Sequence, residues 1–183
     1  MGRDKATLSI GGETLIGRTV RVVAEVAAPV VVVAASGQAL ALEDHVEVVR
    51  DEAPFDGPLA AFARGLAHVA DRATAVFLCG TDHPRLSAAV VRRLVDLGRG
   101  RDAAIAVIEG RRQLLAAVYA AHVRGAADRL LATGERSMKA LATEIDVREV
   151  AAAELLDDPR VREEDATLAS FIDVDTPEDL ERC

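Results

Sequence analysis

Short β-branched runs alternate along this chain with stretches whose apolar residues recur at helical spacing. Leu15–Ala28 has helical periodicity, and Pro29 ends it immediately before the apolar run Val30–Val33. The alternation then repeats as strand, helix, strand, helix, strand and strand, at Val46–Val49, Pro58–Val69, Ala75–Cys79, Ser87–Leu97, Ala103–Ile108 and Leu114–Tyr119. Such a repeat predicts an α/β fold, a doubly wound and mostly parallel sheet covered by helices.

The last third of the chain continues with less regular segments. We expect helices at Ala121–Ala132 and Ser137–Leu141, a short strand at Val147–Val150, a loop over the acidic stretch Glu154–Asp165, a strand at Phe171–Val174 and a helix at Pro177–Arg182. The sequence contains no repeat or linker, so a single domain over residues 1–183 is expected. A domain of this kind usually opens with a central strand, yet only fourteen residues precede the first helix. We therefore expect the first strand to be missing.

Charge and composition narrow the classes of partner. The net charge is −8, and no basic run with interleaved aromatic residues suggests nucleic acid as a partner. Cys79 and Cys183 have no metal-binding spacing, and Val26–Ala35, the longest nearly apolar stretch, falls well short of the roughly 18 residues of a membrane span. Without a signal peptide at Met1, a cytoplasmic location is the expectation, and a homo-oligomer stays open.

Asp82 is the residue whose position most suggests chemistry. It follows the apolar run Ala75–Cys79 and the turn Gly80-Thr81, so it should project from the carboxyl end of a central strand, where open α/β sheets bind ligands. Pro84 keeps a helix from starting at His83. A carboxylate there suits Mg²⁺, although Asp82 can equally well only shape a turn, and His83 is interpreted as a turn residue.

Weaker candidates for site residues lie before and after Asp82 in the sequence. Asp173 and Asp175 stand at i and i+2 and can approach the same cation, whereas Thr176–Asp179 is typical of a capped helix start. Asp51 and the helix start at Asp56–Ala60 can hold a phosphate or ribose oxygen, as any such helix start can. Lys5 can neutralise a phosphate, but lysines near a terminus are mostly solvated.

The order of these pieces resembles the nucleotidyltransferases related to the molybdenum cofactor guanylyltransferases. That family shows a glycine-rich opening ending in Met-Gly-x-Asp-Lys, an Asp followed by a Gly-Pro-Leu helix start, an Asp-x-Pro after a central strand, and a Thr-Pro-Glu-Asp-Leu close. The matching segments here are Met1–Lys5, Asp51 with Gly57-Pro58-Leu59, Asp82-His83-Pro84 and Asp173–Leu180. The resemblance covers essentially the whole chain.

The resemblance implies a Rossmann-like nucleotidyltransferase fold and a Mg²⁺-dependent enzyme. It implies transfer of the GMP moiety of GTP to a phosphorylated small molecule, most naturally molybdopterin, with release of pyrophosphate. Asp82 would be the catalytic metal ligand with Asp175 as a second acidic group. Lys5 would be a catalytic and nucleotide-binding residue, and further nucleotide contacts would come from Asp51, Gly57, Pro58 and Leu59.

Two departures from the family pattern keep alternatives open. The glycine-rich opening and the first strand are absent, which would leave the flanks of the sheet unpaired and predicts poor solubility or a partner that fills the gap. A start codon assigned too late would explain this, as would a non-catalytic relative that binds nucleotide. Asp173 and Asp175 stand where the guanylyltransferases often have Asn, as in the cytidylyltransferase relatives, so CTP stays an alternative to GTP.

Overall fold

The computed structural model describes residues 9–10, 12–51 and 56–173. Its strands are β1 (Ser9–Ile10), β2 (Glu13–Thr14), β3 (Val30–Ala35), β4 (Val46–Asp51), β5 (Ala75–Cys79), β6 (Ala103–Ile108), β7 (Arg111–Ala120) and β8 (Val147–Ala151). Its α-helices are α1 (Leu15–Ala24), α2 (Pro58–Val69), α3 (Ala88–Leu97), α4 (Arg124–Ala132), α5 (Met138–Glu144), α6 (Ala152–Leu156) and α7 (Pro159–Glu164), and its 3-10 helices are η2 (Ala121–Val123) and η3 (Ala169–Phe171). None of these helices has the length and apolar character that a membrane crossing requires.

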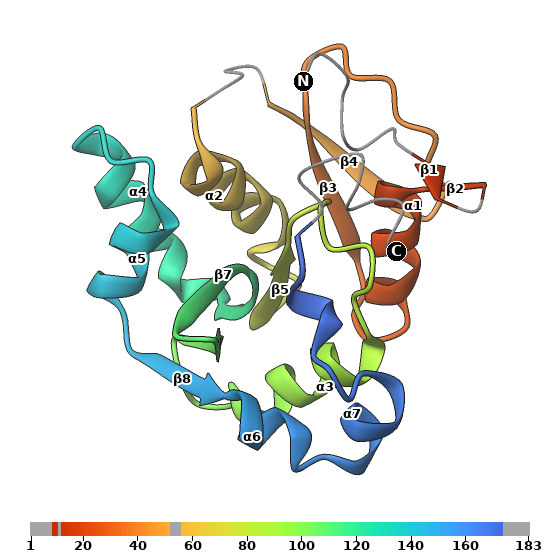
Figure 1. Ribbon diagram of the computed structural model, residues 1–183. Coiled ribbons are helices and arrows are strands. Elements are labelled where there is room, and N and C mark those ends of the chain that lie inside the picture. The colour runs from red at the N-terminus through yellow and green to blue at the C-terminus, as the bar shows by residue number, and fades with distance from the viewer. Residues whose placement is uncertain (1–8, 11, 52–55, 174–183) are drawn as a thin grey trace.

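The main sheet has the strand order β5-β7-β6-β8, with helices on both faces, which confirms the α/β class (Figure 1). Strand β7 runs antiparallel to both of its neighbours, whereas β6 and β8 are parallel. The reversal comes from the turn between β6 and β7, where Glu109 and Gly110 have φ angles of 50° and 76°. Positive φ at both central residues is the geometry of a tight hairpin turn. The sheet is therefore mixed at this point, where the repeat alone predicted parallel strands.

The two faces of the sheet carry separate cores because side chains alternate along its strands. Ala103 and Ile105 of β6 pack with α2, α4 and α5, and Ala104 and Ala106 pack with α3, α6 and α7. Tyr119 of β7 is fully buried on the first face, where its ring centroid lies 4.9 Å from that of Phe62. The two layers of helices hold β5, and hence the segment that follows it, at the centre of the molecule.

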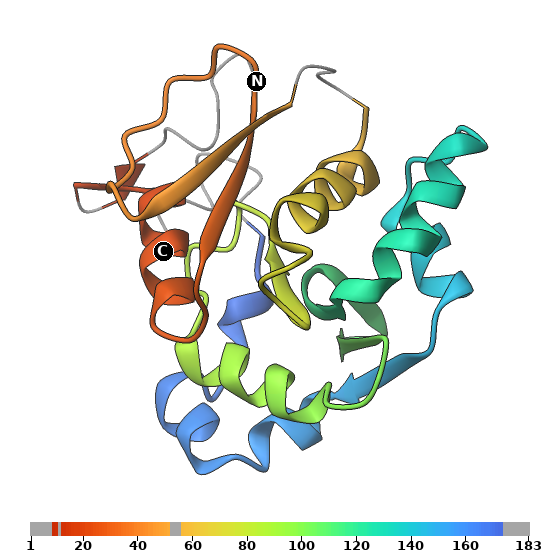
Figure 2. The same ribbon diagram turned by 180° about the vertical axis from the view of Figure 1, so that it is seen from behind.

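An apolar cavity of about 510 Å³ separates β3 from β5. In the described part of the chain, β3 pairs with β4 and β5 pairs with β7, and no strand lies between β3 and β5. Residues of α1 and α2 line the cavity as well, and so do residues of α3 and β7. Figure 2 shows β3 and β5 with α1 and α2 beside them.

Two predictions for the last third of the chain are wrong. Glu154–Asp165, expected to be a loop, contains α6 and α7, whose residues Leu155 and Val161 are fully buried against α3 and β8. Asp158 caps α7 by accepting a hydrogen bond from the Arg160 N–H, and Pro159 occupies the first helical position. The acidic composition of Glu154–Asp165 suggested a loop, although Asp158 followed by Pro159 is typical of a helix start.

Phe171, expected to open a strand, lies in the 3-10 helix η3. The cause is the buried carboxylate of Asp165, which accepts hydrogen bonds from the N–H groups of Ala169 at 2.6 Å and Ser170 at 3.0 Å and so curls the chain. The expected helix Pro177–Arg182 and Val174 lie outside the described residues. The predicted helix Leu15–Ala28 ends earlier, at Ala24.

Candidate functional site

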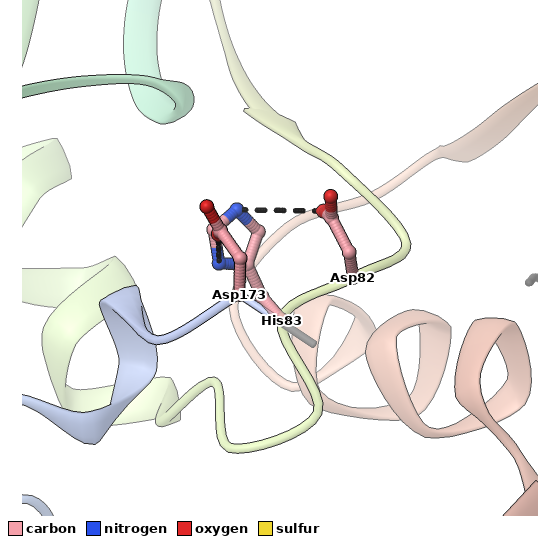
Figure 3. Close-up of side chains that lie close together, drawn as sticks. All are labelled: Asp82, His83 and Asp173. Carbon is pink, nitrogen blue, oxygen red and sulfur yellow. Dashed lines mark ion pairs between the residues drawn. The ribbon is translucent and has the colours of Figure 1, made fainter. Parts of the chain in front are cut away.

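Three side chains that can ligate a cation meet just beyond the end of β5. Asp82 and His83 follow β5, and Asp173 follows η3, ninety residues further along the chain (Figure 3). One potential ligand atom from each lies within 4.8 Å of the others. Asp82 therefore lies beyond the carboxyl end of β5, as expected, although β5 is the edge strand of the described four-stranded sheet. Asp173 is the described acidic partner, and Asp175 lies outside the described residues.

Contacts between two distant segments position this cluster. The Ser170 hydroxyl accepts a hydrogen bond from the Ser87 N–H at 2.8 Å and donates one to the Arg85 carbonyl at 3.3 Å. Ser87 caps α3 by accepting from the Ala89 N–H, and its hydroxyl donates to the Glu164 carboxylate. The segment that carries Asp173 is thus fastened to the one that carries His83.

The cluster contains polar atoms that the described residues leave without hydrogen bonds. The His83 side chain is 4% exposed, and its Nδ1 lies 3.3 Å from Asp173 Oδ1. Its Nε2 lies 3.8 Å from Asp82 Oδ1. Neither His83 Nδ1 nor Asp82 Oδ1 has a hydrogen-bond partner among the described residues, and both atoms are buried. A buried polar atom without a partner is unfavourable, so a ligand that contacts these atoms would stabilise the site.

Cys79 carries the thiol beside this cluster, and the raised pKa of this thiol makes it unsuited to act as a nucleophile. Burial raises the pKa of its thiol, and the nearby carboxylates of Asp82 and Asp173 raise it further. The thiol donates a hydrogen bond to the Gly80 carbonyl. A thiol with a raised pKa stays protonated and is a poor nucleophile, so Cys79 is not a candidate nucleophile.

The other predicted site residues are placed as follows. Asp51 ends β4, and its carboxylate lies 3.1 Å from Arg64 of α2. Pro58 is exposed at the start of α2, whereas Leu59 is fully buried in the core and its N–H donates to the Arg136 carbonyl at 3.3 Å. The Leu59 side chain therefore stabilises the helix start and does not reach a ligand. Lys5 and Asp175 lie outside the described residues.

Gly57 shapes this helix start, and its replacement is expected to destabilise the fold. Its φ angle is 84°, and an added Cβ would lie 3.0 Å from both the carbonyl oxygen and the Cβ of Arg136. Gly100 has a comparable φ of 74° with nothing within 4 Å of an added Cβ. We expect Gly100→Ala to cost about 1 kcal/mol for the backbone alone, and Gly57→Ala about 1–2 kcal/mol more because of the clash.

Denaturant unfolding of the two variants, compared with the parent chain, measures this difference. Equal losses for Gly57→Ala and Gly100→Ala would show that the contact with Arg136 does not constrain the helix start.

Comparison with known proteins identifies the family. Residues 1–149 match the model of the MobA-like NTP transferase domain. A "Probable molybdenum cofactor guanylyltransferase" of Mycobacterium tuberculosis strain H37Rv is 38% identical over 158 residues, which is 84% of this chain and 78% of that protein. The chain belongs to the MobA-like NTP transferases. It is therefore a nucleotidyltransferase by family.

Solved structures agree with this family at the level of the fold. The molybdopterin-guanine dinucleotide biosynthesis protein A of Archaeoglobus fulgidus superposes with a TM-score of 0.75 at 21% identity, over 99% of this chain and 89% of that one. The 2-C-methyl-D-erythritol 4-phosphate cytidylyltransferase of Thermus thermophilus gives 0.72 at 19% identity, over 97% and 91%. The nucleotidyltransferase fold predicted from the sequence is thus confirmed.

The sequence did not predict that His83 would lie in this cluster. A His-Pro pair after a strand is typical of a turn, and only the approach of Asp173 from the far end of the chain makes the imidazole one member of a set. Its near-complete burial beside two carboxylates could not be read from local sequence.

Proposed function

We propose that this MobA-like NTP transferase transfers the GMP moiety of GTP to molybdopterin, a phosphorylated small molecule, with Mg²⁺ held at Asp82. The observation that supports this most is the meeting of Asp82, His83 and Asp173 beyond the carboxyl end of β5. Ligands of open α/β sheets bind at this edge, and the similar mycobacterial protein is named a guanylyltransferase.

The donors present fit a divalent cation. Asp82 Oδ1 is buried and makes no hydrogen bond to the described residues. The Asp82 side chain as a whole is 32% exposed, so a cation can reach its carboxylate. Mg²⁺ prefers carboxylate oxygens and is often held by one or two of them together with substrate phosphates. When bound, Mg²⁺ would neutralise part of the triphosphate charge.

The reaction requires no covalent intermediate on the protein. A phosphate oxygen of the acceptor would attack the α-phosphorus of GTP, forming a new P–O bond while the bond to the β-phosphate oxygen breaks and pyrophosphate leaves. Asp82 would hold the cation at the reacting phosphates, while Asp51 and the turn at Gly57 and Pro58 would contact the nucleotide. Catalysis would rest on orientation and electrostatics, which agrees with the raised pKa of the Cys79 thiol.

CTP is the second candidate donor, favoured by the Asp residue at position 173 and the close structural match to a cytidylyltransferase. Thermal unfolding with Mg²⁺ and GTP, CTP or ATP tests both, because a ligand that binds only the folded state raises its stability. At about 100 times the dissociation constant the gain is about 2.7 kcal/mol, roughly 5 °C or more in Tm. We expect this with GTP and Mg²⁺. A selective rise with CTP would assign the other base, and no rise with any nucleotide would contradict the proposal.

A further inference from the structure

We propose that His83 is a nitrogen ligand of the cation at Asp82, so that this site binds Mn²⁺ more tightly than Mg²⁺. The inference rests on the proposed function, since it concerns the same cation site, and it adds the preferred metal and the residue that determines it.

Each ring nitrogen of His83 is paired with a different carboxylate, Nε2 with Asp82 and Nδ1 with Asp173 (Figure 3). The 3.8 Å between Nε2 and Asp82 Oδ1 is too long for a hydrogen bond. It is short enough for both atoms to ligate one cation, because two ligands at about 2.0–2.2 Å from a metal lie within roughly 4 Å of each other. Nε2 and Asp82 Oδ1 are therefore the pair that we assign to the metal.

Asp173 then has a different role from Asp82. Its Oδ1 lies 3.3 Å from Nδ1, whereas Asp82 Oδ1 is paired with the other ring nitrogen, Nε2. Histidines that ligate a metal usually donate their other N–H to a carboxylate, which fixes the tautomer and the ring orientation. The 3.3 Å contact would become such a hydrogen bond when Nε2 binds the cation, which would make Asp173 a positioning residue for His83. The segment of Asp173 is fastened in place through Ser170.

The burial of His83 argues against a purely structural role. A core histidine normally satisfies its ring nitrogens with hydrogen bonds, whereas the ring nitrogens of His83 face carboxylate oxygens at 3.3 Å and 3.8 Å, and Nδ1 makes no hydrogen bond to the described residues.

The donor set determines the metal preference. Mg²⁺ is a hard cation that takes oxygen ligands, while imidazole nitrogen suits first-row transition ions. One nitrogen beside a carboxylate therefore favours Mn²⁺ without preventing binding of Mg²⁺. His83→Gln removes the nitrogen donor but keeps an amide oxygen at a similar reach, so it should remove the preference for Mn²⁺ and leave Mg²⁺ binding nearly unchanged.

The test is titration of the nucleotide-free chain with Mn²⁺ alone, followed by electron paramagnetic resonance of the free ion, with Mg²⁺ as competitor. We expect Mn²⁺ to bind at least tenfold more tightly than Mg²⁺, and this ratio to fall to about one in His83→Gln. Asp173→Asn should weaken Mn²⁺ binding by about tenfold, as loss of a partner of a metal-bound histidine does. His122→Gln is the matched control and should keep the wild-type ratio.

An unchanged ratio in His83→Gln, or no binding of either ion to the wild-type chain, would overturn the inference. The exposed Asp173 makes a second variant that does not depend on replacing a buried ring, so a loss of folding in His83→Gln would still leave a decisive result. This failure is distinguishable from that of the proposed function. If only the metal assignment is wrong, the selective rise of Tm with GTP and Mg²⁺ would persist. If only the proposed function is wrong, the chain would still bind Mn²⁺ but would not respond to any nucleotide.

Discussion

Asp82→Asn is expected to lower the rate of nucleotidyl transfer by about 10²–10³-fold with little change in stability. The substitution removes the negative charge that would hold the cation, and loss of one electrostatic contact to a transition state has a cost of this size. The Asp82 side chain is partly exposed, and its buried Oδ1 makes no hydrogen bond to the described residues, so the fold loses little.

Asp128→Asn is the matched control for this prediction. Asp128 is an exposed carboxylate on α4 whose partner is Arg124, one helical turn away. Its replacement removes the same charge from the molecule and should leave the transfer rate unchanged. A rate in Asp82→Asn within about threefold of wild type would mean that the reacting phosphates bind elsewhere.

Asp165→Ala is expected to lower the free energy of unfolding by about 2–4 kcal/mol and to weaken metal binding as well. Asp165 is 6% exposed, and its carboxylate accepts hydrogen bonds from two buried N–H groups, those of Ala169 and Ser170. Each N–H left without a partner costs about 1–3 kcal/mol. The turn that fastens Ser170 to Ser87 would loosen, and Asp173 would lose its position beside His83.

Urea unfolding combined with Mn²⁺ titration tests both parts of this expectation. Glu163→Ala, an exposed acidic residue two positions earlier, should change stability by less than about 0.5 kcal/mol. A loss below about 1 kcal/mol in Asp165→Ala, or an unchanged Mn²⁺ affinity, would show that this turn does not position the cluster.

The regular elements could be predicted from the sequence where local signals and burial agree. Pro58–Val69 and Ala103–Ile108 were predicted with the observed bounds. The first has helical periodicity and begins with Gly-Pro, and the second is a continuous apolar run. The direction of β7 was not predicted, although Glu109-Gly110 between two apolar runs is a hairpin signal. Helices α6 and α7 were not predicted, because their fully buried residues are two, Leu155 and Val161, and the charged residues around these two conceal the helical pattern.

The candidate site could be predicted only in part, because its members come from two ends of the chain. Asp82 was placed correctly beyond β5 by the rule for open α/β sheets. The approach of Asp173 depends on the Asp165 turn and the Ser170 contacts, which are tertiary interactions without a local pattern. Leu59 follows the family motif, yet its side chain is in the core. A motif therefore identifies a segment more reliably than it identifies which side chain meets a ligand.

The most direct test of the account is transfer itself. The chain is incubated with Mg²⁺, molybdopterin and GTP labelled at the α-phosphate, and the label is followed into the acceptor while pyrophosphate is measured. We predict equal amounts of labelled product and pyrophosphate for the wild-type chain and for Asp128→Asn, and a loss of both in Asp82→Asn. Folded wild-type protein that binds Mg²⁺ but transfers no label from GTP or CTP would contradict the account.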